Sequence, residues 1–279
     1  MTQDAASDVL LERARAGDRQ ALEALLVRHQ QQVYRFGLKM CRDPEDAQDV
    51  LQDTLLAMAR SVRDFRGESS ISTWLYSIAR SYCIKKRRKS KFAPAETHSL
   101  DAAPGFESAS VADPARLPDE ALADREVRMA LEQAIAALEP MYREVLLLRD
   151  EEGLTAPEVA KVLGIGVPAV KSRLHRARLQ VRERVAPLLG VRMLPAAADE
   201  RPCPDVPKLF SQYLEHEIAA DVCARMEQHL AACPRCRDTC DSLKRTLELC
   251  RTSGSAVEVP AAVQASVKLA LREFLHRRG

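Results

Sequence analysis

The chain has few glycines and few aromatic residues. Only 10 of its 279 residues are glycine, and aromatic side chains make up 4% of the composition. Segments in which apolar and polar residues alternate, the pattern of a half-buried strand, are almost absent, whereas helix-forming residues dominate. These absences argue against a β fold and predict an all-α protein.

Long apolar runs are also missing. No stretch is long enough to span a bilayer, and no secretory signal precedes the first expected helix. We therefore expect a cytoplasmic protein without a membrane partner, in a compartment where thiols stay reduced. A glycine-rich phosphate-binding loop and a paired nucleophile and base are absent as well, so we expect neither an enzyme nor a small-molecule substrate.

Basic charge is concentrated locally although the net charge is only +2. The segment 80–91 reads RSYCIKKRRKSK and holds seven cations and no acid. Such a block can be a solvated helix face, or it can bind the nucleic acid backbone in a salt-dependent way. We favour nucleic acid, with contacts from Arg80, Lys85, Lys86, Arg87 and Arg88.

The length predicts two or three domains. We expect a helical domain at 8–92, a flexible linker at 93–118, a second helical domain at 119–188, a second linker at 189–202, a cysteine-rich domain at 203–250 and an amphipathic helix within 251–279. In the first domain, the run Asp43-Pro44-Glu45-Asp46 has the proline and acids of a helix start. A loop is expected over 63–70, and a helix resumes at about Ser72.

The second domain contains the pattern of a helix-turn-helix. Thr155 and Glu158 form a capping box at the start of one helix, and Gly164-Ile165-Gly166 makes a tight turn before the next. The second helix of such a motif enters the major groove of DNA. Polar and cationic side chains off its apolar stripe are expected to reach phosphates and guanine edges. These residues are Lys171, Ser172, Arg173, His175, Arg176 and Arg178.

Six of the eight cysteines lie between Cys203 and Cys250. Within this segment, His229-x3-Cys233-x2-Cys236 places an imidazole and two thiols within two helical turns, and Cys203 supplies a fourth donor. A Cys3His set is typical of a closed, tetrahedral Zn2+ site with a structural role. The alternative is a helical hairpin whose reduced cysteines act as small hydrophobic residues.

Three further thiols of this segment, Cys223, Cys240 and Cys250, exceed what one structural zinc needs. They can form an additional site for a thiophilic metal such as Cu or Cd, act as oxidation-sensitive thiols, or be inert and buried. Cys41 and Cys83 lie in expected helices of the first domain, where we expect them in the core.

Two long segments resemble one protein family. The segment 43–89, DPEDAQDVLQDTLLAMARSVRDFRGESSISTWLYSIARSYCIKKRRK, resembles region 2 of group IV (extracytoplasmic-function) sigma factors. The segment 154–178, LTAPEVAKVLGIGVPAVKSRLHRAR, resembles their region 4. The resemblance implies binding to core RNA polymerase, through its β′ clamp and β flap, and to the −10 and −35 elements of a promoter.

The resemblance also implies roles for particular residues. The positions that match the helix docking on the β′ clamp are Asp49, Gln52, Asp53, Thr54 and Leu55. The loop from Phe65 to Ser72 matches the one that captures an unstacked −10 base, and the following Trp74 can either stack on bases or pack in the core. The family has Asn and Asp where Ser81 and Lys85 stand here, which predicts more phosphate attraction and a changed −10 preference.

The segment 203–236 resembles the zinc-binding domain of anti-sigma factors of the ZAS type. Its fusion to the two sigma regions implies a sigma factor whose activity is gated by its own C-terminal domain, in response to metal or redox state. The alternative is a metal- or redox-responsive DNA-binding regulator that works without polymerase. The amphipathic helix at 261–278 either adds a second helix to the contact between the zinc-binding domain and the sigma regions, or completes the core of the small domain.

Overall fold

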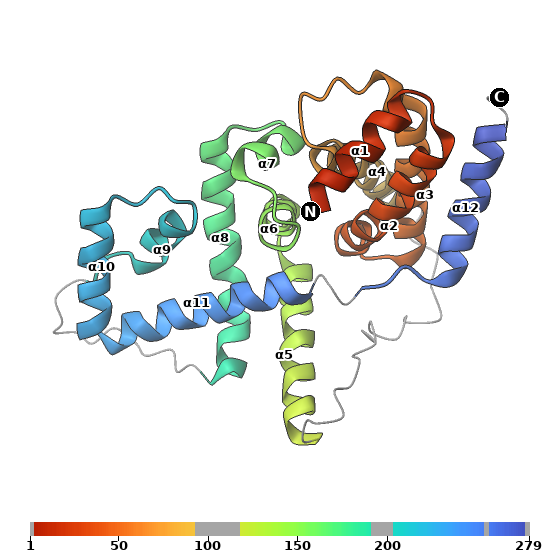
Figure 1. The fold of residues 1–279 in the computed structure, drawn as a ribbon. Coiled ribbons are helices and arrows are strands. Elements are labelled where there is room, and N and C mark those ends of the chain that lie inside the picture. The colour runs from red at the N-terminus through yellow and green to blue at the C-terminus, as the bar shows by residue number, and fades with distance from the viewer. Residues whose placement is uncertain (1–2, 93–117, 191–202, 254–256, 277–279) are drawn as a thin grey trace. The chain divides into compact units, whose positions relative to one another are not determined.

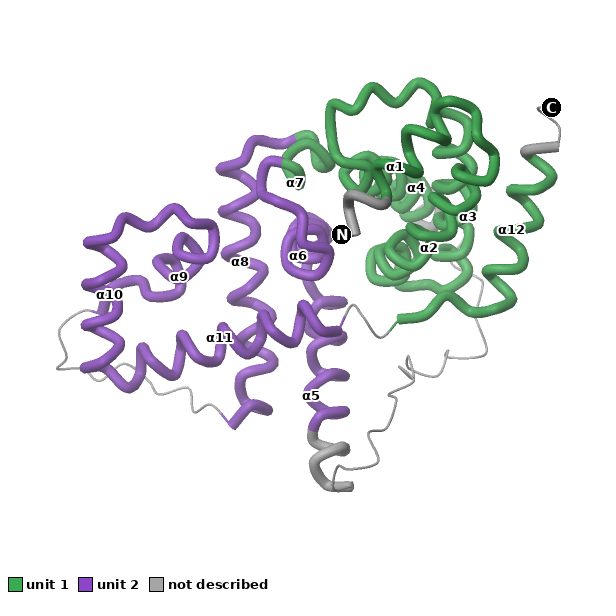
Figure 2. The backbone as a smooth tube through the Cα atoms, viewed as in Figure 1, with its two compact units in different colours: residues 1–110, 158–164, 256–279 green, residues 111–157, 165–255 purple. Residues whose placement is uncertain are grey.

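A computed structural model describes residues 3–92, 118–190, 203–253 and 257–276 (Figure 1). Across these residues every regular element is a helix, so the predicted all-α class is confirmed. Most of each expected linker, at 93–118 and 189–202, lies outside the described residues. The chain divides into two compact units, which Figure 2 colours separately.

Unit 1 comprises Met1–Ser110, Glu158–Gly164 and Ala256–Gly279. Its helices are α1 (Gln3–Arg15), α2 (Arg19–Cys41), α3 (Pro44–Ser61), the short 3-10 turn η1 (Val62–Asp64), α4 (Ile71–Phe92) and α12 (Ala261–His276).

The helix start predicted at Asp43 is present. The side chain of Asp43 accepts a hydrogen bond from the amide of Asp46 at 2.8 Å, and Pro44 occupies the first helical position. Both features favour a sharp N-terminus because they satisfy or remove donors that a helix start leaves without partners. The expected loop begins with η1, and α4 starts at Ile71, one residue before the predicted Ser72.

The core of unit 1 lies between α2, α3 and α4. Phe36 and Tyr76 are almost completely buried and meet edge to face, with ring centroids 5.4 Å apart. At Gly37 the backbones of α2 and α3 approach so closely that an added Cβ atom would lie 3.4 Å from the Cα atom of Ala47. This packing holds α3 and α4, the two helices predicted to contact polymerase and DNA, in one rigid bundle.

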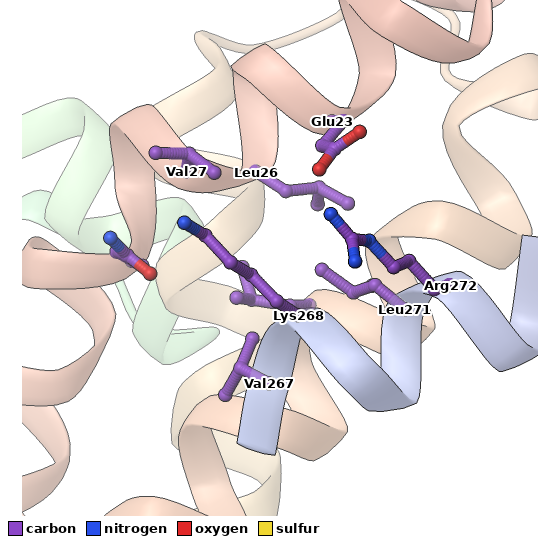
Figure 3. Close-up of a pocket in the computed structure, with 9 residues that line it drawn as sticks. Glu23, Leu26, Val27, Val267, Lys268, Leu271 and Arg272 are labelled. Atoms are coloured by element: carbon purple, nitrogen blue, oxygen red, sulfur yellow. The ribbon is translucent and has the colours of Figure 1, made fainter. Parts of the chain in front are cut away.

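The C-terminal helix α12 packs on α2 and α3 (Figure 3). Its apolar stripe buries Val263, Val267 and Leu271. The last two line a small hollow with Leu26 of α2 and Leu55 of α3, both fully buried, and Glu23, Lys268 and Arg272 also line it. Burial of this stripe stabilises α12 by the usual hydrophobic contribution of its aliphatic side chains.

Unit 2 comprises Val111–Pro157 and Ile165–Ser255, so the division runs through α7. The elements of this part of the chain are α5 (Pro118–Ala137), α6 (Pro140–Leu146), the π-helical turn η2 (Leu147–Glu151), α7 (Ala156–Leu163), α8 (Val167–Val185), the 3-10 turn η3 (Ala186–Leu189), α9 (Val206–Leu214), α10 (Ala220–Ala232) and α11 (Pro234–Ser253).

The helices α7 and α8 are joined by the tight turn that the sequence predicts. Gly164 has a φ of +66°, a left-handed conformation that glycine adopts without strain. Gly166 accepts the first backbone hydrogen bonds of α8, and Pro168 lies in its first turn. The inward stripe of α8 is formed by the buried Val170, Leu174 and Val181.

We call α9, α10 and α11 the cysteine module. Its small core consists of Val206, Phe210, Cys236, Cys240, Leu243 and Leu247. No helix among the described residues is both long and apolar enough to cross a membrane.

Candidate metal centre and nucleic-acid-binding helices

Four side chains of the cysteine module converge as the sequence predicts. One donor atom each from Cys203, His229, Cys233 and Cys236 lies within 4.8 Å of all the others. Cys203 precedes α9, whose N-cap is Asp205. His229 lies in the last turn of α10, Cys233 at the junction of α10 and α11, and Cys236 in the first turn of α11.

The four side chains fit a zinc ion. The Nε2 atom of His229 is buried without a hydrogen-bond partner, and all three cysteines are free thiols. Tetrahedral zinc with bonds of about 2.3 Å to sulfur separates its ligand atoms by about 4 Å, which the observed cluster allows. Burial and the neighbouring thiols of Cys203 and Cys233 raise the pKa of Cys236 to about 12, because each disfavours a negative charge on its sulfur.

The three surplus thiols do not join this cluster. Cys240 lies in the small apolar core next to Cys236, and Cys250 is fully buried farther along α11. Cys223 is only partly buried on α10, where its thiol donates to Glu227 at 3.8 Å. Burial raises the pKa of both Cys223 and Cys240, so neither thiol is activated in this state.

The cysteine module packs on α8 within unit 2. Lys171 forms an ion pair with Glu217, which follows α9. His175 is hydrogen-bonded to Ser211 of α9, with Nδ1 and Oγ 3.0 Å apart. Two of the predicted DNA-contacting residues of α8 are thus engaged by the module, whereas Ser172 and Arg176 remain exposed and Arg173 is partly buried.

A buried ion network anchors this contact. Arg178 donates to both carboxylate oxygens of Asp150 in η2, at 2.8 and 2.6 Å, and its side chain is 2% exposed. Glu215, at the end of α9, lies 3.4 Å from Arg178 and 3.2 Å from Arg149. Nearby, Arg182 donates to Ser242 of α11 at 2.6 Å.

The expectation that Arg178 reaches DNA phosphates is therefore wrong. Its guanidinium points into the protein because Asp150 pairs with it there, and this carboxylate comes from a π-helical turn that periodicity does not reveal. Acidic residues in the segment 150–152 are the only sequence signal that could have indicated a buried partner.

The basic face of α4 carries the residues predicted to read the −10 element. Lys85, Arg87 and Arg88 are exposed, and Arg80 is partly buried. Lys86 instead pairs with Asp49 and, at 3.2 Å, with Asp46, both on α3. These ion pairs raise the pKa of Lys86, so it stays charged.

The residues matched to the polymerase-docking helix divide into two groups on α3. Asp49 and Asp53 are exposed and Gln52 is partly exposed, whereas Thr54 and Leu55 are fully buried. Partial burial and the neighbouring Asp49 raise the pKa of Asp53. The first three can meet a partner directly, and the last two hold α3 in the bundle.

The single tryptophan packs within its own unit. Trp74 lies against Phe65, with ring centroids 4.8 Å apart, and is partly buried. The aromatic pair fixes the two ends of the loop matched to base capture.

Family models match three consecutive parts of the chain: "Sigma-70 region 2" at residues 25–92, "Sigma-70, region 4" at 128–181 and "Putative zinc-finger" at 203–237. The RNA polymerase sigma-H factor of Pseudomonas aeruginosa is 30% identical over 184 residues, which are 64% of this chain and 94% of that protein. Other relatives at 30% identity are ECF RNA polymerase sigma-E factors. The chain belongs to the extracytoplasmic-function sigma factors. It therefore works with RNA polymerase and promoter DNA as a transcription initiation factor.

Comparison with another relative shows that this sigma factor is the longer of the two proteins. The ECF RNA polymerase sigma-E factor of Escherichia coli K12 is 30% identical over 193 residues, 68% of this chain and 99% of that protein. About a third of this sigma factor thus has no counterpart in that relative.

Two solved structures are similar to this chain. The sigma factor RpoE in complex with the anti-sigma factor NepR from Bartonella quintana matches at 22% identity with a TM-score of 0.45, and the match covers 61% of this chain and 96% of that one. CnrH in complex with the cytosolic domain of CnrY matches at 25% identity and a TM-score of 0.44, covering 64% and 96%.

Proposed function

We propose that the C-terminal part of this sigma factor holds it inactive by occupying two working surfaces, and that metal or thiol chemistry at the cysteine module sets how firmly it does so. The observation that carries the proposal is the engagement of α8 by the module through Lys171 and His175. A lysine that is paired with a carboxylate of its own protein cannot neutralise a DNA phosphate at the same time.

The first occupied surface is the DNA face of α8. The ion pair of Lys171 with Glu217 is partly exposed and contributes little by itself. The buried network of Arg178, Asp150 and Glu215 contributes more to orientation, because breaking it leaves charge without a partner in a dry site. Since the module is covalently attached, its high effective concentration allows a modest contact to hold the closed state.

The second occupied surface is α3. Helix α12 covers Leu55, and Arg60 lies beneath the ring of Phe274, with its guanidinium carbon 5.5 Å from the ring centroid. Gln52 lies about one turn before Leu55 and two turns before Arg60, so at 100° per residue its side chain projects on the side of α3 between these two contacts. In this proposal α12 competes with the β′ clamp for that side, while region 4 is the part that meets the β flap.

DNA contact is assigned to basic and polar side chains of α4 and α8. On α4 these are Lys85, Arg87 and Arg88, with Arg80 and Lys86 beside them, facing the −10 element. On α8 the exposed Ser172 and Arg176 and the partly buried Arg173 join Lys171 and His175 in reading the −35 element once the module leaves.

Zinc is the cation proposed for the Cys3His cluster. Four protein donors leave no open position for substrate, so the ion would supply folding energy and no catalysis. Loss of zinc, or oxidation of its thiols, would unfold the surface that meets α8 and so release region 4. Capture of Cu or Cd by the surplus thiols Cys223, Cys240 and Cys250 remains a prediction.

The deciding experiment is transcription in vitro with core polymerase. The full-length protein, loaded with zinc, is compared with a truncation that ends at Leu189. We expect the truncation to be the more active, and we expect chelation to activate only the full-length protein. Equal activity of the two proteins would refute gating, and loss of activity on truncation would show that the module activates.

A second experiment isolates α12. Leu271→Asp places a charge in the seam on α2 and α3, whereas Leu269→Asp on the same helix changes a side chain that is 61% exposed. We expect the first variant to bind core polymerase more tightly than the wild type and the second to bind equally. Equal affinity of both variants would mean that α12 does not obstruct α3.

A further inference from the structure

Two cysteines of region 2, neither of them a proposed zinc ligand, form a thiol pair. Cys41 is the last residue of α2, and Cys83 lies in the middle of α4. Their thiols are hydrogen-bonded to each other, and both are free. The two helices pack directly together, and 41 residues of sequence lie between the two cysteines.

The two thiols differ in access. Cys83 is 4% exposed, whereas Cys41 is partly exposed at the corner between α2 and α3. That corner is held tightly: Arg42 has a left-handed backbone with a φ of 65°, and its amide donates to the carbonyl of Leu38 at 2.9 Å. A small oxidant can therefore reach Cys41, with Cys83 behind it in the protein.

The surroundings favour the thiolate of Cys41. The thiol of Cys83 donates to it and lowers its pKa, and the nearby Lys86 acts in the same direction. Burial and the carboxylates of Asp43 and Asp46 oppose this shift without reversing it. A thiolate is the form that attacks oxidants.

We propose that Cys41 and Cys83 form a reversible disulfide when a hydroperoxide oxidises Cys41. The sulfur of Cys41 attacks one peroxide oxygen: an S–O bond forms, the O–O bond breaks, and water leaves in the case of hydrogen peroxide. The sulfur of Cys83 then attacks the Cys41 sulfenic acid: the S–S bond forms and a second water leaves. Both thiols are oxidised by two electrons in total, and the peroxide is reduced to two waters.

The disulfide would tie α4 to the end of α2. Cys83 stands between Arg80 and Lys85, and Lys86 follows one turn later. The covalent link thus restrains the helix segment to which the proposed function assigns −10 contacts, and oxidation is expected to alter −10 affinity. This consequence rests on the proposed function, but formation of the bond does not.

The test uses the full-length, zinc-loaded protein treated with hydrogen peroxide, trapped with iodoacetamide and digested with trypsin. Cleavage at the flanking basic residues releases peptides 40–42 and 81–85, each with one cysteine. We expect these two peptides joined, with a loss of two of the eight thiols, and full reversal by dithiothreitol. Because the readout is specific to these peptides, oxidation of the zinc thiols is recognised separately.

Variants sharpen the test. The joined peptides must vanish in Cys41→Ser and in Cys83→Ser and must persist in Cys223→Ser, which removes another partly exposed thiol. If peptide 81–85 stays alkylated while Cys41 accumulates as a sulfinic acid, the inference is wrong. It is equally wrong if Cys41 pairs only with a cysteine of the module. Because the wild-type protein provides the main result, a variant that fails to fold does not remove the test.

Discussion

The helical bundle of unit 1 buries large aliphatic and aromatic side chains, among them Leu25, Phe36 and Tyr76. The cysteine module has a core cluster of six residues, of which two are cysteines. A small domain buries too little apolar surface to offset its conformational entropy, and it needs another source of stability. From this difference we predict that the module needs the proposed zinc ion for its stability whereas the bundle does not, so the proposed gating is placed in the module.

The largest effect should come from removing one zinc ligand. Cys233→Ser is expected to abolish zinc binding and to unfold α9, α10 and α11, since structural zinc contributes on the order of 10 kcal/mol to such domains. Hydrogen exchange would show amides of 206–250 losing protection while those of α2 and α3 keep theirs. Cys223→Ser is the matched control. Retained protection of the module in Cys233→Ser would contradict the comparison.

A cavity in the bundle should have the next largest effect. Leu25→Ala, at a fully buried site, is expected to lower the free energy of unfolding of unit 1 by about 2–5 kcal/mol. Zinc content should not change. Val9→Ala, at a side chain that is 58% exposed, should cost far less, and denaturant titration followed by fluorescence of Trp74 measures both. A comparable loss from the two variants would show that the bundle is not held by its core.

Substitutions in the contact between the module and α8 should have smaller effects than substitutions in the module's zinc site or in the core of the bundle. Glu215→Gln removes a charge whose side chain is 8% exposed and weakens the network around Arg178. We expect docking to weaken by about 1–3 kcal/mol, and −35 DNA to bind about tenfold more tightly to the full-length protein. Glu248→Gln, on the exposed side of α11, is the control. Unchanged DNA affinity in Glu215→Gln would show that the ion network of Glu215 and Arg178 does not hold the module on α8.

Acid should loosen the same contact slightly. Burial lowers the pKa of His175 from its ordinary value of 6.5, and the nearby cations Arg176, Arg178 and Lys208 add to the effect, while Asp205 opposes it. The undocked state therefore takes up a proton more readily, so the contribution of His175 to docking is fully present above pH 6.5 and is lost progressively below it. DNA affinity measured from pH 7.5 to 5.5 should rise more in the wild type than in His175→Gln. Parallel pH profiles of the two proteins would show that His175 does not cause the pH dependence of docking.

Much of the fold and of the zinc cluster could be predicted because local chemistry determines it. Asp43 and Pro44 have the side-chain acceptor and the fixed φ that favour a helix start, and His229, Cys233 and Cys236 are close enough in sequence for the end of one helix and the start of the next to bring them together. The left-handed Gly164 follows from the turn that its neighbours require.

The contacts between distant segments could not be predicted. An amphipathic pattern shows that α12 has an apolar face but does not say that α2 and α3 bury it. The turn η2 departs from 3.6-residue periodicity, so the carboxylate of Asp150 and its capture of Arg178 were hidden. In both cases the missing information is a partner far away along the chain.

The four proposed zinc ligands lie at helix ends, and one of those helices is long. Cys236 belongs to the first turn of α11, which runs for 20 residues and so extends about 30 Å, to Ser253 beside Glu151 of η2. A rigid rod of that length converts a tilt of about 10° at its cysteine end into a displacement of about 5 Å at the other. Because α11 also packs on α8 and η2, a tilt that begins at the proposed metal ligands would be passed to both of these elements at once.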